Sequence, residues 1–387
     1  MSSDVNPGDL AIVGYPFLPI GMGEHARSTF RAFRAAGKTA GLLDVADQKG
    51  EVDADLDRDF SPFLAPSAAE VNLFCVNGDE AARVIETVGR KAFDSAYNIV
   101  YPAWELARYP ECWAKVLERF DEVWAPSAFI RDAIAGAVSK PVVHMPLAVD
   151  LKLSAFLGRR HFGIPEDAFV VLFFFDFSSF ADRKNPAAVL EAFERVAARR
   201  PDANIHCVIK SRGGSDADEA QLALEARLAA LAPRAQAIYG DLSDNEIKNL
   251  VRVCDVFVSL HRSEGFGRGM AEAMAMGRPA IATAYSGNLD FMTPQTSLLV
   301  DYDLVPVAEG AYPHGDGQVW AEASPEHASR LIEQLLDDPA EARAMGARAK
   351  AHIRQNFCVR AIGQRYVDRL AAIRGLTLFR KLGSRAA

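Results

Sequence analysis

Two carboxylates, Glu264 and Glu272, stand eight residues apart in the segment EGFGRGMAE. At about 100° per residue, side chains at this spacing would not share one face of a helix. We therefore expect Glu264 in a loop and Glu272 in the second turn of the helix that follows. One carboxylate could then bind hydroxyl groups on one side of a docked phosphate and the other those on the opposite side. A sugar, a diphosphate and a ribose would fit in that order.

A glycine-containing turn lies between these two carboxylates. The strand before it should end near Leu260, and the helix after it should begin near Gly267 and run to about Met276. The first amides of a helix have no partner inside the helix and carry the positive end of its dipole, so an anion can dock there without a metal ion. Gly265, Phe266 and Gly267 are therefore predicted to bind the donor, and the amides of the helix start, Gly267 to Met270, to contact its phosphates.

Two adjacent cations, Arg183 and Lys184, follow the first expected strand of the second half of the chain and precede a helix that Asn185 and Pro186 help to open. Arginine offers bidentate geometry and lysine a point charge, so the pair could neutralise a departing diphosphate. A solvated basic turn is the alternative interpretation. Lys210, at the end of the next expected strand, is a candidate third cation.

Four segments together carry a resemblance to a known family: EGFGRGMAE, FFFDFSSFADRKNPAAVLEAF, YPAWELARYPECWAKVLERFDEVWAPSAFI and TAYSGNLDFM. The chain resembles the retaining glycosyltransferases of family 4 over most of its length. The resemblance implies the GT-B architecture, an α/β fold in which two Rossmann-like domains with mostly parallel sheets face an interdomain cleft. It also implies that Glu264 contacts the transferred sugar, that Glu272 contacts the nucleotide ribose, and that Arg183 and Lys184 neutralise the diphosphate.

A loop near the N-terminus, GYPFLPIGMGEHARSTF, places Gly21 and Gly23 between the first expected strand and the first expected helix. Glycine allows a ligand to approach the backbone closely, so this loop could meet the diphosphate of the donor. A tight structural turn is the alternative. His25 and Arg27 lie one turn into the helix, where they either line the acceptor side of the site or lie on the surface.

Trp104 and Glu105 follow another expected strand of the first half and are expected to face the cleft. A tryptophan ring can stack on a sugar while a carboxylate accepts its hydroxyl groups, so both residues are predicted to bind the acceptor. A packed tryptophan beside an exposed glutamate is the alternative. Asn288 is either a hydroxyl-binding residue on the acceptor side or an ordinary turn residue.

Short apolar runs alternate with segments of helical period along most of the chain, which is typical of parallel sheets covered by helices. Two helices are expected at Glu24–Ala36 and Asp79–Gly89. Strands are expected at Leu10–Tyr15, Thr39–Asp44, Val71–Val76, Asn98–Tyr101, Glu122–Ala125, Pro141–Met145, Phe169–Phe175, Ile205–Lys210, Ala237–Tyr239, Val256–Leu260 and Pro279–Thr283. Two α/β units are the simplest account of this order.

The apolar pattern lapses between Val149 and Pro165, where a hinge is expected. This divides the chain into an acceptor-side domain at 1–155, a domain that binds the nucleotide sugar at 156–365 and a C-terminal helix or tail at 366–387. Ligands of open α/β sheets bind beyond the carboxyl ends of the strands. The basic and partly apolar tail could contact anionic lipid, or it is a docked helix that packs back on the first domain.

The chain has 387 residues, 50% of them hydrophobic, and a formal net charge of −8. It can bury a large core, and its negative charge argues against nucleic-acid binding. Five separated cysteines without a CxxC pair suit a reducing compartment, and no apolar run approaches the roughly 20 residues of a membrane span, so we expect a cytoplasmic protein. Asp53, Asp55 and Asp57 are expected in a solvated acidic loop, and neither a metal ion nor a cofactor is expected.

These observations and the resemblance predict an enzyme that moves a hexose from a nucleotide diphosphate sugar to a hydroxyl group of a glycan or lipid-linked acceptor, with retention of configuration. Mannose is the expected sugar on the basis of the resemblance, and UDP-sugars are almost equally well supported as donors. Two alternatives stay open at this point. The protein could be a nucleotide-sugar epimerase of the same architecture, or a sugar-binding or nucleotide-binding protein without catalysis.

Overall fold

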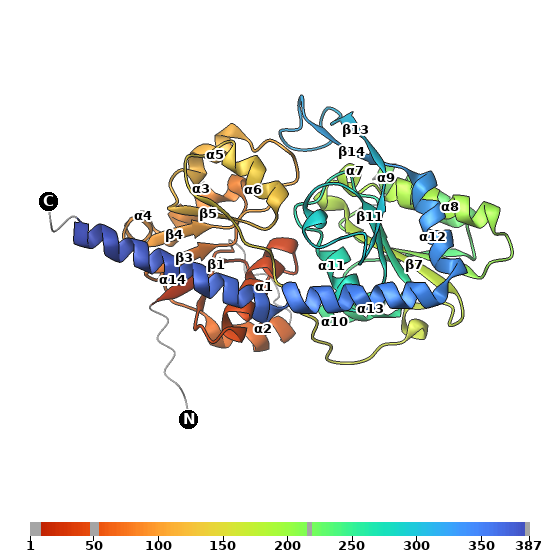
Figure 1. Cartoon of the computed structure of the whole chain (residues 1–387), viewed down its shortest axis with the longest axis horizontal. Helices are drawn as coiled ribbons and strands as arrows, with labels where there is room; N and C mark the ends of the chain where they lie inside the picture. Colours follow the sequence, from red (N-terminus) through yellow and green to blue (C-terminus); the bar gives the residue numbers. More distant parts are fainter. Residues whose placement is uncertain (1–8, 47–53, 215–218, 384–387) are drawn as a thin grey trace. The chain divides into compact units, whose positions relative to one another are not determined.

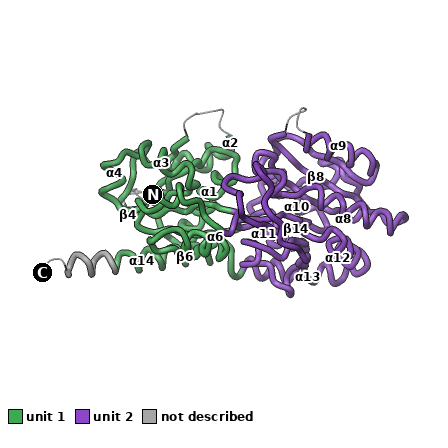
Figure 2. Tube along the Cα trace, turned by 90° about the horizontal axis from the view of Figure 1, so that it is seen from above, with its two compact units in different colours: residues 1–104, 108–150, 355–387 green, residues 105–107, 151–354 purple. Residues whose placement is uncertain are grey.

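The computed structural model of the protein describes residues 9–46, 54–214 and 219–383, which fall into two compact units (Figure 2). Unit 1 groups residues 1–104, 108–150 and 355–387, and unit 2 groups residues 105–107 and 151–354. The short segment 105–107 therefore belongs to a different unit from the residues on either side of it. Asp53, for which a loop was predicted, lies outside the described residues.

A six-stranded parallel sheet forms the centre of unit 1, with the strand order β2-β1-β3-β4-β5-β6. Its inner strand β1, next to the edge strand β2, is buried along its whole length because helices cover both faces of a parallel sheet. Each strand lies within two residues of a predicted run. The strands are β1 (Leu10–Gly14), β2 (Gly41–Asp44), β3 (Val71–Phe74), β4 (Tyr97–Val100), β5 (Glu122–Ala125) and β6 (Val142–His144).

The helices of unit 1 are α1 (Gly21–Ala35), α2 (Ala54–Phe60), α3 (Gly78–Val88), α4 (Arg90–Asp94), α5 (Glu111–Leu117), α6 (Ala128–Ala135) and α14 (Val359–Gly383), with a 3-10 turn η1 (Ser61–Phe63). Helix α1 begins three residues before the predicted start, so Gly21 and Gly23 lie in its first turn and not in the loop before it. Asp55 and Asp57 lie in α2, where a loop was expected. Two acidic residues in the first turn favour that helix because they face the positive end of its dipole.

Helix α14 brings the far end of the chain back onto unit 1, where it packs along α1 (Figure 1). A Cβ atom added to Gly363 would lie 1.9 Å from the Ala32 carbonyl oxygen, so the two helices touch backbone to backbone there. One turn later Tyr366 is fully buried, with its ring centroid 5.1 Å from that of Trp124, and its hydroxyl donates to the Pro146 carbonyl at 2.9 Å. Arg385 of the predicted basic tail lies outside the described residues.

Unit 2 contains the second six-stranded sheet, with the strand order β12-β11-β10-β7-β8-β9, and its pairs are also parallel. The central strand β7 has the sequence FVVLFFFD, a continuous apolar run of the kind that a strand covered on both faces requires. All but β12 were predicted. The strands are β7 (Phe169–Asp176), β8 (Ile205–Arg212), β9 (Ala235–Tyr239), β10 (Val256–Ser259), β11 (Ala280–Thr283) and β12 (Leu298–Val300).

The helices of unit 2 are α7 (Ala181–Lys184), α8 (Pro186–Arg199), α9 (Glu219–Ala230), α10 (Asp244–Val253), α11 (Arg268–Ala275), α12 (Pro325–Asp337) and α13 (Pro339–Asn356), with 3-10 turns η2 (Arg159–Phe162), η3 (Phe177–Ser179) and η4 (Gly287–Asp290). An antiparallel hairpin of β13 (Tyr302–Pro306) and β14 (Val319–Ala323) follows β12. No strand was predicted for the hairpin. Most of β13 is exposed, so it lacks the apolar run by which the other strands were found.

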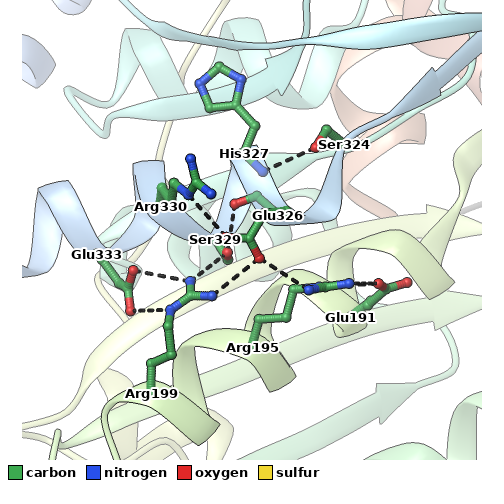
Figure 3. Close-up of polar contacts among 9 residues, drawn as sticks. All are labelled: Glu191, Arg195, Arg199, Ser324, Glu326, His327, Ser329, Arg330 and Glu333. Atoms are coloured by element: carbon green, nitrogen blue, oxygen red, sulfur yellow. Dashed lines mark hydrogen bonds and ion pairs between the residues drawn. The ribbon is translucent and has the colours of Figure 1, made fainter.

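Ion pairs join α8 to α12 on the surface of unit 2 (Figure 3). The Arg199 guanidinium donates to Glu333 at 3.0 Å, to Glu326 at 3.3 Å and to the hydroxyl of the buried Ser329 at 2.6 Å. Arg195 donates to the same Glu326 carboxylate at 3.1 Å. A connected network of this kind holds a helix pair better than isolated surface pairs do.

No helix within the described ranges is both long enough and apolar enough to cross a membrane.

Candidate functional site

Two loops of unit 2 meet at one edge of its sheet. Strands β7 and β10 pair in parallel, with Val171 opposite Val256, so both strands end at the same edge. The chain after β7 forms α7, which carries Arg183 and Lys184, and the chain after β10 carries Glu264. Topology alone therefore brings the predicted cations and the first predicted carboxylate together.

The side chains of Arg183, Lys184 and Glu264, here called the Glu264 cluster, contact one another. Lys184 Nζ donates to Glu264 Oε1 in a short hydrogen bond, and Arg183 Nη1 lies 3.4 Å from Glu264 Oε2. The Arg183 guanidinium also donates to the carbonyl oxygens of Ser263 at 3.0 Å and Ser179 at 3.2 Å. Arg183 is 4% exposed and Glu264 is 9% exposed, so these charges are largely removed from water.

Electrostatics keep Glu264 and Arg183 charged, whereas burial lowers the pKa of Lys184 in spite of the neighbouring Glu264 carboxylate. Burial by itself raises the pKa of Glu264, but the positive charges of Lys184 and Arg183 outweigh it and lower the pKa to about 2. Burial likewise lowers the pKa of Arg183, and the negative charges of Glu105 and Glu264 reverse that shift and raise it. Glu264 is therefore an anion and Arg183 a cation over the whole range of physiological pH.

The backbone that carries the cluster is held in an unusual conformation. Phe180, Asn185 and Ser286 have φ values of 64°, 53° and 74°, in the left-handed region that residues with a side chain rarely adopt. Phe180 and Asn185 flank α7, while Ser286 Oγ accepts a hydrogen bond from the Glu264 amide at 2.8 Å. Such conformations cost free energy and persist where the surrounding structure enforces them, often at functional sites.

The glycine-containing turn before α11 packs directly against the turn that begins at Ser286. A Cβ atom at Gly287 would lie 1.9 Å from the Gly265 carbonyl oxygen, so only glycine fits. The Phe266 side chain is 5% exposed and its ring packs against Phe291, with the centroids 5.1 Å apart. In this turn the backbone, and not the buried Phe266 ring, is the part that could contact a ligand. Gly267 is the N-cap residue of α11, and Glu272 lies in the second turn of that helix, as predicted.

Asn288 lies beneath this turn and is fully buried. Its amide nitrogen donates to the Thr283 carbonyl at 3.0 Å, and its oxygen lies 3.2 Å from His261 Nε2. His261 Nε2 also faces the Tyr285 carbonyl at 3.3 Å and His261 Nδ1 faces the Ser259 hydroxyl at 3.0 Å, which assigns the proton to Nε2. Burial lowers the pKa of His261, so the ring stays neutral. These contacts make Asn288 a support for the loop that carries Glu264.

Lys210 lies near the carboxyl end of β8, the strand next to β7. The residue is 5% exposed, and burial, together with the charge of Arg212, lowers the pKa of Lys210. Arg212 itself pairs with Asp176 at the end of β7, with Arg212 Nε 2.6 Å from Asp176 Oδ2. A further basic side chain therefore lies at the same edge of the sheet as the Glu264 cluster.

Glu105 and Tyr312, which belong to unit 2, meet at the Glu264 cluster. The Tyr312 hydroxyl donates a short hydrogen bond to Glu105 Oε2, and the Arg183 guanidinium carbon lies 5.8 Å from the centre of the Tyr312 ring. Glu105 was predicted from the sequence, whereas Tyr312 and His261 were not. One signal for Tyr312 was available in the sequence. It is an aromatic residue within the glycine-rich stretch EGAYPHGDG, and a large apolar side chain in such a loop is expected to pack against another part of the protein.

The remaining predicted residues, His25, Arg27, Gly21, Gly23 and Trp104, lie in unit 1. Arg27 Nη1 donates to the Pro16 and Leu18 carbonyl oxygens at 3.0 and 2.9 Å. A Cβ atom on Gly23 would lie 2.1 Å from the same Leu18 oxygen, while one on Gly21 would meet no atom within 4 Å.

Both aromatic candidates of unit 1 are buried, with His25 2% exposed against the Tyr101 ring and Trp104 2% exposed. Trp104 Nε1 donates to the Arg108 carbonyl at 3.0 Å. Gly23, His25, Arg27 and Trp104 therefore all have structural contacts within unit 1, and the surface position given as the alternative for His25 and Arg27 is wrong because both are buried. Their predicted ligand contacts stay predictions.

In the part of the chain that the structure describes, no group of three or more His, Cys, Asp or Glu side chains is placed to hold a metal ion. The chemistry available at the Glu264 cluster is that of charge. Two cations beside a turn with backbone amides can bind a doubly negative group such as a diphosphate, and ionised carboxylates next to it can accept hydrogen bonds from hydroxyl groups.

Comparison with known proteins gives a family match in unit 2. The family model described as "Glycosyl transferases group 1" matches residues 158–352. A GDP-mannose-dependent monoacylated alpha-(1-6)-phosphatidylinositol monomannoside mannosyltransferase of Corynebacterium glutamicum is 28% identical over 198 residues, which are 49% of this chain and 45% of that protein. A mannosylfructose-phosphate synthase of Agrobacterium fabrum is 30% identical over 112 residues, 28% of this chain and 24% of that protein. The matched segment thus spans less than half of either relative.

Solved structures match over nearly the whole chain. The Anabaena protein Alr3699/HepE, in complex with UDP and glucose, aligns with a TM-score of 0.69 at 14% identity and covers 94% of this chain and 100% of its own. The sucrose-phosphate synthase tll1590 of Thermosynechococcus elongatus aligns with a TM-score of 0.65 at 17% identity over 95% of this chain and 100% of its own. At these identities the likeness concerns the fold, and the predicted GT-B architecture of two α/β units with parallel sheets is confirmed.

Proposed function

The chain belongs to the family of group 1 glycosyl transferases, and from this we propose that it transfers a hexose from a nucleotide diphosphate sugar to a hydroxyl group with retention of the anomeric configuration. The observation that carries the proposal is the Glu264 cluster, in which the buried Arg183 and Glu264 and the half-buried Lys184 meet at the carboxyl edge of the unit 2 sheet. Ligands of open α/β sheets bind at this edge.

Arg183 and Lys184 would stabilise the departing diphosphate. When the bond between the anomeric carbon and the phosphate oxygen breaks, negative charge grows on that oxygen, and fixed cations in a site that excludes water stabilise the charge strongly. Hydrogen bonds to the Ser263 and Ser179 carbonyls already hold the Arg183 guanidinium, so it does not reorganise during the reaction. Backbone amides of residues 265–267 would add donors to the same phosphate groups.

The two carboxylates would bind the two sugars of the donor, which are the hexose and the ribose. Glu264 is ionised at neutral pH and can accept hydrogen bonds from hydroxyl groups of the transferred hexose. Glu272, in the second turn of α11, would bind the hydroxyl groups of the ribose. We propose that the acceptor hydroxyl attacks the anomeric carbon from the face that the diphosphate leaves, and that a phosphate oxygen takes the proton of that hydroxyl.

The names of the relatives indicate which donor and which acceptor to propose. A curated relative is named for GDP-mannose and a phosphatidylinositol mannoside acceptor, so we propose mannose as the sugar and a glycan or lipid-linked glycan as the acceptor. UDP is the nucleotide named for the Anabaena structure, which keeps UDP-sugars as the second choice. Peripheral contact of the C-terminal tail with a membrane likewise stays a prediction.

Nucleotide binding followed by turnover tests the function. In a thermal-shift panel of GDP, UDP, ADP and dTDP, we expect one nucleotide to raise the melting temperature, because a ligand that binds only the folded state stabilises it. The matching nucleotide sugar is then incubated with and without acceptor candidates, and nucleotide diphosphate release is followed. Release that needs the acceptor supports transfer. Interconversion of the sugar would support an epimerase instead, and an unchanged donor would support a protein that only binds.

The Lys184→Met variant tests the role given to the cluster. We expect kcat to fall about a hundredfold or more, because an interaction that grows in the transition state is removed. Lys115→Met is the matched control, since Lys115 is exposed and lies in unit 1. If folded Lys184→Met protein turns over at the rate of the control, Lys184 has no part in stabilising the leaving group.

A further inference from the structure

The hairpin β13–β14 is built onto the backbone that carries the Glu264 cluster. Its Glu322 carboxylate accepts hydrogen bonds from Asn185 Nδ2 at 2.9 Å and from Arg262 Nε at 2.7 Å. The Ala321 amide donates to the Arg262 carbonyl at 2.9 Å, and the Arg262 amide donates to the Arg183 carbonyl at 2.8 Å. The base of the hairpin is therefore connected through Arg262 to the residue that holds the Glu264 carboxylate.

The loop of the hairpin, residues 307–318, is internally ordered. The Gly315 amide donates to the Tyr312 carbonyl at 3.1 Å, and Gln318 Nε2 donates to the His314 carbonyl at 2.8 Å. His314 adopts a φ of 53°, which bends the chain sharply after Tyr312. These contacts fix the direction from which Tyr312 leaves the loop.

Tyr312 points inward from this loop and is 9% exposed. Its ring packs edge-on against Phe180, with centroids 4.9 Å apart, and also lies beside the Arg183 guanidinium. Its hydroxyl reaches past both to donate to Glu105 Oε2. Because the ring is held on two sides, the hydroxyl has a fixed position, and the Glu105 carboxylate is fixed with it.

The negative charge of Glu105 determines which groups of a ligand it can bind. A carboxylate repels a phosphate group, so Glu105 marks the limit of the anion site around Arg183 and would not itself bind the diphosphate. With Oε2 held by Tyr312, Oε1 is oriented to accept a hydrogen bond, and the ligand group that can donate one is a hydroxyl.

We infer that Tyr312 is a positioning residue of this enzyme, which holds Glu105 so that its second carboxylate oxygen binds a hydroxyl group of the ligand at the Glu264 cluster. The inference rests on the proposed function, because the ligand is taken to be a sugar donor or its acceptor. The hydroxyl belongs either to the transferred sugar or to the acceptor, and the two sources differ in what they predict for the binding of the donor alone.

Three variants and one control test the inference: Tyr312→Phe, Glu105→Gln, the double variant, and Tyr302→Phe. Tyr302 is on the same hairpin, is 37% exposed and contacts the ring of Tyr285, so its change to phenylalanine removes the same chemical group and leaves the hydrogen bond from Tyr312 to Glu105 in place. The dissociation constants of the nucleotide diphosphate and of the nucleotide sugar are measured for each protein, followed by KM and kcat for the acceptor. Melting temperatures identify any variant that fails to fold.

If the hydroxyl is on the transferred sugar, Tyr312→Phe and Glu105→Gln weaken nucleotide sugar binding about tenfold, as expected for loss of a hydrogen bond to a charged group, and leave nucleotide diphosphate binding unchanged. If it is on the acceptor, donor binding is unchanged and the KM of the acceptor rises by about the same factor. In either case the double variant is no worse than the poorer single variant, because both changes remove one interaction.

Two outcomes would overturn the inference, and they are distinct from failure of the proposed function. Tyr312→Phe could match Tyr302→Phe in every constant, or the two single losses could multiply in the double variant. In both cases Tyr312 only anchors the hairpin. If the wild-type protein binds no nucleotide sugar at all, the proposed function is wrong, and the inference that rests on it is wrong as well.

Discussion

Glu264 is the residue on which the local chemistry of unit 2 depends. Two cations hold its carboxylate ionised, while the Glu264 amide is held by Ser286 and the Glu264 carbonyl accepts the Gly287 amide at 2.9 Å. Removing one partner of a buried ion pair destabilises a protein because the other charge is left without compensation. The same carboxylate therefore contributes to both stability and the proposed donor binding.

This coupling predicts a specific pH dependence. The pKa of Glu264 is about 2 in the folded protein and ordinarily 4.5, so the folded state releases this proton more readily than the unfolded state. The resulting stability, roughly 3 kcal/mol, is present in full above pH 4.5 and is lost as the pH falls toward 2. We expect Glu264→Gln to be less stable than the wild type at pH 7 and to lack this loss on acidification.

Urea unfolding at pH 7, 5 and 3 measures the effect, with Glu111→Gln as the control. Glu111 is 87% exposed and pairs with a lysine that is itself exposed, so its loss should leave the pH profile of the unfolding free energy unchanged. Parallel profiles for the wild type and Glu264→Gln would mean that the two cations do not depress the pKa of this carboxyl.

At the level of single residues, the sequence predicted which groups would meet but not which of their atoms would be available. Arg183, Lys184 and Glu264 were found because each follows a recognisable strand. Burial of the Phe266 ring and of the Asn288 amide depends on contacts with Phe291 and His261 that no local pattern encodes. Tyr312 was missed for the same reason, since its partner Glu105 is 207 residues away.

At the scale of elements, helix α14 makes the most extensive helix contact in unit 1, along α1. The contact requires glycine at position 363, where an added Cβ atom would lie 1.9 Å from a backbone oxygen of α1. Backbone atoms cannot move aside as a flexible side chain can, so the two helices would have to separate to accommodate a larger residue.

We predict that Gly363→Ala lowers the unfolding free energy of unit 1 by about 1–3 kcal/mol through this overpacking. Gly375→Ala is the matched control on the same helix, because a Cβ atom there would meet no other atom within 4 Å. Alanine has the higher helix propensity, so the control should be as stable as the wild type or up to about 1 kcal/mol more stable. Denaturant unfolding measures both, and equal stabilities would contradict the close contact between the helices.

Prediction of the elements succeeded where burial produces a continuous apolar run. The predicted run Phe169–Phe175 corresponds to β7, and ten further runs correspond to strands. Strand β12 has only three residues and β13 is largely exposed, so neither has the pattern that helices on both faces impose. The start of α1 was placed too late because two glycines normally signal a loop, whereas here Gly23 is required by its contact with the Leu18 carbonyl.

At the scale of the whole molecule, a net charge of −8 surrounds a site proposed to bind an anion. The cations Arg183 and Lys184 are balanced by Glu264 and Glu105, so the site has little net charge of its own at a distance. Attraction of the diphosphate therefore begins only at short range, where desolvation strengthens it.

We therefore expect the association rate of the nucleotide diphosphate to be insensitive to salt. Between about 0.05 and 0.5 M NaCl, stopped-flow measurement should give rate constants that agree within about a factor of two or rise slightly as the repulsion is screened. A tenfold fall in the rate constant over this range would reveal long-range steering by a positive field, which this charge distribution does not provide.

Unit 1 is completed by α14, which follows unit 2 along the chain. During synthesis on the ribosome, α1 and the sheet of unit 1 emerge early, while the helix that covers Phe33 and Trp124 through Tyr366 is translated only after residues 151–354 of unit 2. The nascent protein must therefore carry an uncovered apolar face while all of unit 2 is being made. Chains that stop before α14 should bind chaperones or aggregate through this face, so unit 1 buries its apolar surface only once α14 has been made.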